Sequence, residues 1–432
     1  MILFAHTITA RLEYVAAFLG TQLRGIPVKL TCNQAEFSAY PGARINYSDK
    51  KITADECWLP PSSLLFEQGI RPQPITCFET NGYKAFFKTG GDYPFDILAA
   101  VFYLLSRYEE YLPHKKDLYG RFAHTESLAF KEGFLGIPLI HYWLKDFSAM
   151  LSLKFPLFSS GNNVFHFLPT YDIDEAFSFK HKGWIRNTGA ALKDLLKGNR
   201  ARLRQRHKVR MNQEPDPFNS YDWMDDVHEK YKLEPRYFFL VAEKNASYDR
   251  NILPGKAVVS ALIRRHADKY EVGLHPSWQS GDDPALLRRE KERLEQAAGI
   301  RVASSRQHFI RFHVPGTFRR LIANGIKEDF SMGYGSINGF RASVSVPFYW
   351  YDLENETATG LLLYPFCYMD ANSFYEQQYS AQQALAEMKQ YYAEVKNVNG
   401  LFISIWHNTF LGTDERFKGW REVYLEFLDQ HC

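Results

Sequence analysis

The chain has 432 residues, a length at which a single hydrophobic core stops growing, so two domains are expected. Hydrophobic residues make up 45% and charged residues 23%, which is ordinary for a globular enzyme, and a formal net charge of only +3 argues against a nucleic-acid partner. Aromatic residues make up 16% of the chain. Aromatic side chains can stack on sugar rings, so this content is compatible with a carbohydrate-binding protein but does not demonstrate one.

The cysteines and the first residues indicate the compartment. No cysteine pair has the CxxC spacing, which argues against a zinc ribbon and against a secreted disulfide scaffold; the five are Cys32, Cys57, Cys77, Cys367 and Cys432. Polar residues such as Arg11 and Glu13 interrupt the apolar run of residues 1–20, so we expect no signal peptide. No stretch reaches the roughly 18 apolar residues that a membrane span needs. We therefore expect a cytoplasmic protein.

The first 158 residues combine short strands with two helices. The predicted strands are residues 2–5 and 28–31, and apolar residues at helical spacing predict helices over 95–111 and 137–151. No cluster of catalytic residue types stands out, so we expect an α+β accessory domain. It could cover the mouth of a site, bind the far end of a substrate or mediate assembly. The small polar residues 159–163 mark the expected boundary.

From residue 159 onward, apolar runs alternate with amphipathic helices, which is the pattern of a parallel α/β sheet or barrel. The predicted strands are 164–168, 237–241, 272–274, 361–366 and 401–405, and the clearest helices are 284–298 and 381–395. Four strands lead into a carboxylate or an imidazole: Asp172 with Asp174, His275, Asp370 and His407. Because the carboxyl ends of parallel strands meet at one edge, we expect these side chains to lie together.

A basic insertion interrupts this alternation near residues 180–235. From Lys193 to Arg210 the chain carries eight Lys or Arg and one Asp. The simpler interpretation is a solvated helical excursion. The alternative is a patch for an anionic substrate or for peripheral contact with a membrane surface.

Asp172 and Asp174 are two residues apart, so their side chains share a face if the segment is extended. Two neighbouring carboxylates repel each other unless a cation or an arginine lies between them. One of them can then bind a metal ion while the other acts as a base. The alternative is a pair of loop aspartates that cap a helix over residues 175–179. His275 and His407 could each be structural, and their shared position at strand ends favours a functional role.

These segments resemble the motifs of the polysaccharide deacetylases, the NodB-homology domain of carbohydrate esterase family four. Residues 170–174 (TYDID) resemble the first motif and 272–275 (VGLH) the second, while 339–342 (GFRA) resemble the arginine motif and 401–407 the last one. Their order agrees with that of the family from residue 160 to the end. The resemblance implies an α/β fold, a distorted (β/α)7 barrel over residues 159–432, with zinc or a related divalent ion.

The resemblance also implies roles for four residues that act on the substrate. Asp172 would be the general base, and Arg341 would orient it. His407 would be the general acid, with Asp370 tuning that histidine.

The implied metal ligands are Asp174 and His275, and the third ligand departs from the family pattern. The second motif usually has another histidine four residues after the first, but Gln279 stands there, and an amide is a poor ligand for zinc. His308 is the candidate to fill the gap from a neighbouring strand, and His313 is a weaker one. A structural role for His308 is equally open.

Two functions of different classes follow. The first is a metal-dependent hydrolase that removes an acetyl group from an N-acetylated sugar of a polysaccharide or glycan precursor, lipid-linked or nucleotide-linked if the protein is cytoplasmic. Hydrolysis of another small amide or of an O-acetyl ester would use the same groups. The second is a catalytically inactive barrel that binds a saccharide or a partner protein, which Gln279 motivates. The sequence does not indicate the oligomeric state.

Overall fold

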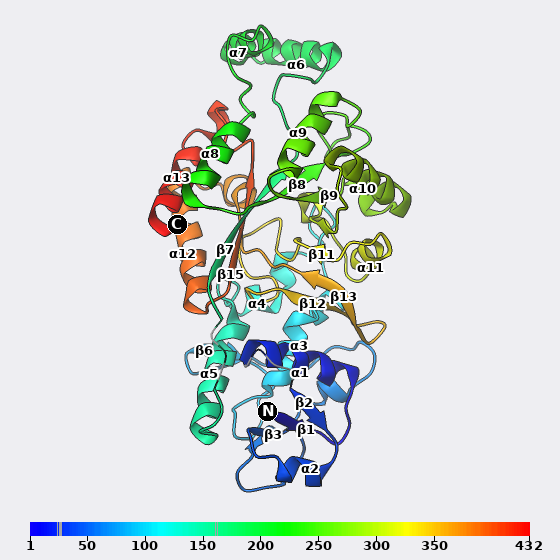
Figure 1. Cartoon of the computed structure of the whole chain (residues 1–432), viewed down its shortest axis with the longest axis vertical. Coiled ribbons are helices and arrows are strands. Elements are labelled where there is room, and N and C mark those ends of the chain that lie inside the picture. Colours follow the sequence, from blue (N-terminus) through cyan, green and yellow to red (C-terminus); the bar gives the residue numbers. More distant parts are fainter. Residues whose placement is uncertain (24, 26–27, 160, 162) are drawn as a thin grey trace.

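The computed structural model describes residues 1–23, 25, 28–159, 161 and 163–432. Figure 1 shows the N-terminal residues at one end of the long axis, a large sheet in the middle, and helices α6 (Trp184–Leu196) and α7 (Arg200–Arg210) at the other end. Residues 160 and 162 of the predicted boundary loop lie outside the described residues. The division into two domains at this loop stays a prediction.

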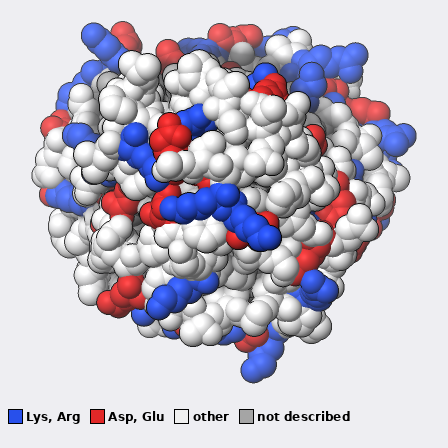
Figure 2. Space-filling model, turned by 90° about the horizontal axis from the view of Figure 1, so that it is seen from below, with Lys and Arg blue, Asp and Glu red and all other residues white. Residues whose placement is uncertain are grey.

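The N-terminal region, residues 1–158, contains a four-stranded parallel sheet in the order β2-β1-β3-β4. The strands are β1 (Ile2–Phe4), β2 (Lys29–Thr31), β3 (Arg44–Asn46) and β4 (Cys57–Trp58), and a separate hairpin is formed by β5 (Phe78–Thr80) and β6 (Tyr83–Ala85). The helices are α1 (Ala10–Leu23), α2 (Gln34–Ala39), α3 (Ile97–Leu105), α4 (Leu128–Lys131) and α5 (Leu139–Lys154). Lys, Arg, Asp and Glu are interspersed on this end of the molecule (Figure 2).

The helix predicted over residues 95–111 is shorter in the structure. It ends at Leu105, because Arg107 adopts a left-handed conformation with φ of 53° that a helix cannot continue. The side chain of Arg107 is buried and bonds to Glu109 and Glu110. The chain therefore turns where this ion cluster forms.

A nine-stranded sheet occupies the C-terminal region, in the order β12-β13-β11-β10-β9-β8-β7-β15-β14. The strands are β7 (His166–Ile173), β8 (Arg236–Leu240), β9 (Glu271–His275), β10 (Ser304–Ser305), β11 (Glu328–Asp329), β12 (Phe348–Asp352), β13 (Thr357–Leu363), β14 (Tyr368–Met369) and β15 (Leu401–His407). All pairs are parallel except β12 with β13.

Helices connect these strands and surround the sheet (Figure 1). They are α8 (Tyr221–Tyr231), α9 (Ala257–Ala267), α10 (Pro284–Ala298), α11 (Gly316–Ala323), α12 (Ala381–Asn397) and α13 (Trp420–His431). The mixed α/β architecture agrees with the prediction. Within the described residues no strand pair joins the two ends of the sheet, β12 and β14, and the closed barrel stays a prediction.

Two details of the strands differ from the sequence prediction. Strand β7 extends through Ile173, and no helix forms over residues 175–179, so the two aspartates do not cap a helix there. The predicted strand 361–366 ends at Leu363 because Pro365 lacks the amide hydrogen that a strand ladder needs. A separate strand, β14, leads into Asp370 and pairs with β15.

The basic insertion forms a helical hairpin, α6 and α7, that projects from the body beyond the carboxyl end of β7, whereas α8 lies beside α13 on the body (Figure 1). Asp216 fixes the root of this hairpin, because its carboxylate accepts hydrogen bonds from the backbone of Ser178, Phe179 and Lys180 at 2.7 to 2.9 Å. No helix in the described part of the chain is long and apolar enough to cross a lipid bilayer.

Candidate metal centre and active site

A cavity of about 520 Å³ opens at the carboxyl edge of the nine-stranded sheet. Five residues predicted from the sequence line it together: Asp172, Asp174, His275, His308 and His407. They lie at or just beyond the carboxyl ends of four strands, β7, β9, β10 and β15. Parallel strands thus bring residues from distant parts of the chain to one place, as expected for this class of fold.

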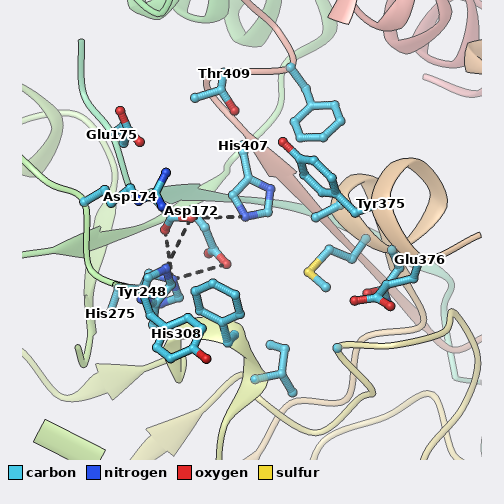
Figure 3. Close-up of a pocket in the computed structure, with 18 of the residues that line it drawn as sticks. Asp172, Asp174, Glu175, Tyr248, His275, His308, Tyr375, Glu376, His407 and Thr409 are labelled. Carbon is cyan, nitrogen blue, oxygen red and sulfur yellow. Dashed lines mark ion pairs between the residues drawn. The ribbon is translucent and has the colours of Figure 1, made fainter. Parts of the chain in front are cut away.

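Asp174, His275 and His308 form a group whose potential ligand atoms lie within 4.8 Å of one another. The Nε2 atom of His275 is 3.1 Å from Oδ1 of Asp174, and Nε2 of His308 is 3.5 Å from Oδ2 of the same carboxylate. Figure 3 shows ion-pair lines that join Asp174 to both histidines and to His407. One carboxylate and two imidazoles are a ligand set that suits zinc and related ions.

The hydrogen bond of His275 indicates that a cation fits between His275 and Asp174. Nδ1 of His275 is 2.5 Å from the carbonyl oxygen of Arg306, which can only accept, so Nδ1 carries the proton. In the neutral ring, Nε2 then directs a lone pair towards Asp174. Oδ1 of Asp174 is itself buried, with no hydrogen-bond partner among the described residues. Two lone pairs 3.1 Å apart require a positive charge between them.

The pKa of His308 and that of Asp174 show how strongly this cluster attracts positive charge. Burial lowers the pKa of His308, but the carboxylates of Asp174 and Asp249 outweigh it and raise the pKa to about 9. Burial raises the pKa of Asp174, and the neighbouring histidines reverse this and hold it well below its usual range. Because a ligand imidazole must lose its extra proton, metal binding here is coupled to proton release.

Asp172 lies beside the cluster and is held by an arginine that the sequence analysis did not single out. Nη1 of Arg306 donates to Oδ1 of Asp172 at 2.8 Å, and both side chains are buried. Nε of Arg306 donates to the carbonyl oxygen of Phe330 at 3.1 Å, which fixes the guanidinium. The second oxygen, Oδ2, lies 3.8 Å from Nε2 of His275. Asp172 therefore keeps one oxygen bound and one near the candidate metal ligands.

Arg341, which was expected to orient Asp172, lies elsewhere. Its guanidinium donates to both carboxylate oxygens of Glu110 at 2.8 and 2.6 Å and to the carbonyl oxygen of Gly333 at 2.9 Å. Glu110 also accepts from Arg107 at 2.8 Å. Arg341 is thus satisfied by a buried carboxylate of the N-terminal region, and this ion cluster joins the two regions instead of serving the cavity.

His407 is hydrogen-bonded to Asp370, which fixes the direction of its ring. Nδ1 of His407 is 2.6 Å from Oδ1 of Asp370, and the backbone N–H of His407 donates to Oδ2 at 2.7 Å. Nε2 therefore points away from this pair and lies 3.7 Å from Oδ2 of Asp174. Burial lowers the pKa of His407, but the nearby carboxylates, Asp370 foremost, raise it to about 10. The imidazole can therefore carry a transferable proton at neutral pH.

Gln279 does not belong to the ligand group. Its Nε2 donates to Oδ2 of Asp249 at 3.0 Å, and Oδ1 of Asp249 lies 3.0 Å from Nδ1 of His308. Asp249 is fully buried and also accepts from the backbone of Trp278 at 2.8 Å. Gln279 thus supports the carboxylate that orients His308. His313 lies outside the ligand group.

We expect Asp249→Asn to lower the metal affinity by about 10- to 100-fold, because a carboxylate behind a ligand histidine fixes its tautomer and increases its basicity. Competition with a chelating dye measures this change. Asp282→Asn is the matched control, since Asp282 is an exposed aspartate of the loop between β9 and α10 and bonds to Arg311 instead of a candidate ligand. An unchanged affinity in Asp249→Asn would remove His308 from the ligand set.

The N-terminal region contributes to the wall of the cavity. Tyr119 and Arg121 lie on a turn held by Asp117, and Arg121 donates to the carbonyl oxygen of Phe309 at 2.6 Å. The ring of Tyr119 lies 5.4 Å from that of Phe309 and 5.9 Å from that of Tyr248. These three aromatic residues and Arg121 all line the cavity. One wall is thus aromatic and comes partly from residues 1–158.

Sequence analysis missed Arg306, Asp249 and Tyr119. Arg306 had a signal, because it stands two residues before His308 and a buried carboxylate pair needs a cation. Asp249 lies in an ordinary polar loop, and only the fold brings it behind His308. Tyr119 had no signal, since nothing in residues 1–158 indicated contact with the cavity.

Comparison with known proteins gives the following likenesses. Residues 1–156 match the model of a family of unknown function, DUF7033. No curated protein matches the chain. Similar solved structures include a protein of Mycobacterium smegmatis assigned as a polysaccharide deacetylase, with 14% identity, a TM-score of 0.40, and coverage of 63% of this chain and 86% of that one.

Two further structures are similar to the same extent. A Pseudomonas aeruginosa protein assigned as a polysaccharide deacetylase has 13% identity, a TM-score of 0.39, and coverage of 62% of this chain and 84% of that one. An allantoinase has 11% identity, a TM-score of 0.38, and coverage of 62% and 83% respectively.

Proposed function

We propose that this chain is a metal-dependent hydrolase that removes the acetyl group from an N-acetylated sugar. One observation carries the proposal: a candidate base held by an arginine, a candidate acid held by a carboxylate, and three candidate metal ligands line one cavity. Amide hydrolysis needs each of these parts, because water must be activated and the amine must leave protonated.

Asp174, His275 and His308 would hold the divalent ion, with zinc as the proposed metal. When bound, this ion would supply a Lewis acid for the acetyl carbonyl and would lower the pKa of water. Asp172 accepts the proton of the attacking water through the oxygen that Arg306 leaves free. Arg306 holds this carboxylate in position through the hydrogen bond from Nη1 to Oδ1.

His407 completes the reaction. As the bond between the carbonyl carbon and nitrogen breaks, Nε2 of His407 donates a proton to the nitrogen, and acetate and the free amine are formed. Asp370 holds Nδ1 and so presents Nε2 to the cavity. The proton taken by Asp172 and the proton given by His407 balance, so the site returns to its starting state by exchange with solvent.

The aromatic wall suits the apolar face of a sugar ring, since such rings stack on aromatic side chains. We expect Tyr119→Ala to raise KM roughly three- to tenfold, which corresponds to about 1 kcal/mol of lost contact, with a smaller effect on kcat. Steady-state kinetics measure both constants. Tyr349→Ala, which removes an exposed tyrosine of β12, is the control. An unchanged KM for Tyr119→Ala would exclude the ring of Tyr119 from substrate binding.

Acetate release tests the proposal. Zinc-loaded protein is incubated with N-acetylglucosamine oligomers, a nucleotide-linked and a lipid-linked N-acetylhexosamine, an O-acetylated sugar and a simple acetamide, and acetate is followed by proton NMR. We expect release from at least one N-acetylated sugar, loss on treatment with a chelator, and recovery with zinc. Release from the ester or acetamide alone would contradict a sugar N-deacetylase. Binding of the sugars without turnover would favour the inactive, saccharide-binding alternative.

A further inference from the structure

Helix α6 carries an uncovered apolar face. Four large apolar side chains of this helix are exposed: Trp184 by 72%, Leu192 by 57%, Leu195 by 60% and Leu196 by 80%. At 3.6 residues per turn, these positions fall on one side of the helix. Apolar side chains gathered on one exposed face of a projecting helix indicate a surface that is covered in use.

The opposite side of α6 is already occupied by α7, so the apolar face does not pack within the hairpin. Arg206 of α7 donates to Asn187 at 3.1 Å and to Asp194 at 2.7 Å, and both of these residues belong to α6. The guanidinium of Arg206 also lies over the ring of Phe179, 4.7 Å from its centre, which ties the hairpin to its root. The hairpin is therefore held together by its own contacts, and the apolar face of α6 is exposed.

Positive charge surrounds this apolar face. From Trp184 to Arg210 the chain has nine Lys or Arg and a single Asp. Several of these cations are exposed and have no acidic partner among the described residues: Lys193, Lys197, Arg200, Arg204 and Arg210. The far end of the molecule differs, because positive and negative side chains alternate there (Figure 2).

We propose that the hairpin α6–α7 docks this protein onto an anionic lipid membrane, with the apolar face of α6 inserted among the headgroups. An amphipathic helix with Trp and Leu on one side and Lys and Arg on the other lies in the interface plane of a bilayer. The apolar face matches the acyl boundary, and the cations match the phosphate groups.

The hairpin also lies next to the rim of the cavity. Arg202 of α7 is 3.5 Å from Asp414, which in turn bonds to Arg416 at 2.9 Å, and Arg416 lines the cavity. The hairpin leaves the sheet beyond β7, at the edge where the cavity opens. Docking through α6 therefore brings the cavity rim close to the lipid surface.

Vesicle flotation with the full-length protein tests this docking. Vesicles of phosphatidylcholine alone are compared with vesicles that also contain phosphatidylglycerol. We expect the wild type to float with the mixed vesicles and far less with the neutral ones, and high salt to release most of it because salt screens the cations. Leu192→Ser/Leu195→Ser should reduce the partition coefficient by about tenfold or more, since each leucine loses its buried apolar area.

The matched control is Leu153→Ser/Leu157→Ser, which removes two leucines of the N-terminal region that are even more exposed, and this variant should float like the wild type. Brominated lipid should quench tryptophan fluorescence in the wild type and much less in Trp184→Phe. Failure of the wild type to float, or flotation of the α6 variant like the wild type, overturns the proposal. If the protein forms a dimer in the absence of vesicles and the α6 substitutions dissociate this dimer, the apolar face would belong to an interface with a second copy. That result would overturn the proposal as well. None of these readouts depends on hydrolytic activity.

Discussion

Asp172→Asn should lower kcat for acetate release by about 10²- to 10⁴-fold, which is the contribution that a positioned general base makes. The asparagine keeps the size of the side chain and can still accept a hydrogen bond from Arg306, so the cavity should keep its shape. It cannot take a proton from water. Zinc content should stay that of the wild type, because Asp172 is not one of the three proposed ligands.

Asp352→Asn is the matched control for this substitution. Asp352 is also a buried aspartate held by an arginine, since Arg319 donates to its two oxygens at 2.7 and 2.8 Å, but it lies on β12 and does not line the cavity. The folded control protein should turn over at the wild-type rate. Activity of Asp172→Asn within a few-fold of the wild type would contradict its role as the base.

His407→Gln should also lower kcat for an N-acetylated sugar by about 10²- to 10⁴-fold, because an amine leaves only when it is protonated. An ester with a p-nitrophenolate leaving group needs no such proton. We therefore expect this variant to lose about tenfold or less on p-nitrophenyl acetate, whereas Asp172→Asn loses activity on both substrates. Parallel assays on the amide and the ester measure the difference. Equal losses of His407→Gln on both would contradict its role as the acid.

Periodicity in the sequence located the elements whose signals are local. The helix predicted over residues 284–298 is α10 with the same bounds, because Asp283 caps it, Pro284 begins it and Gly299 ends it. The strand predicted over 401–405 extends only two residues further as β15. The sequence predicted only a helical excursion within Lys193–Arg210 and did not predict helix α6, whose apolar side faces outward instead of packing on a core.

The candidate site was predictable where a residue follows an apolar strand, as His275 and His407 do. The site was not predictable where two residues of the same type could fill one role. Arg306 follows the short strand β10, and Arg341 lies in the GFRA segment. The packing of Glu110, which is 231 positions from Arg341 in sequence, engages Arg341 and leaves Arg306 for Asp172. Spacing alone favoured the arginine within the recognisable motif.

Position 279, where the family pattern has a histidine and this chain has Gln279, also shows that the sequence does not reveal contacts between distant segments. The sequence placed Gln279 where an imidazole was expected, and it offered His308 as an unproven substitute. The fold brings His308 to Asp174 from the neighbouring strand and assigns Gln279 to Asp249 instead. The candidate residues could therefore be named from the sequence, whereas the partner of each one depends on contacts between distant segments.

The metal content of the purified protein tests the central claim most directly. Wild-type protein, Asp174→Ala, His275→Ala, His308→Ala and His313→Ala are supplied with zinc, dialysed together and measured by mass spectrometry of the metal. We predict roughly one zinc ion per chain in the wild type and in His313→Ala, and almost none in the other three variants. A wild-type protein that retains no metal, or a His308→Ala variant that keeps it, would contradict the proposed metal site and favour a barrel that only binds its ligand.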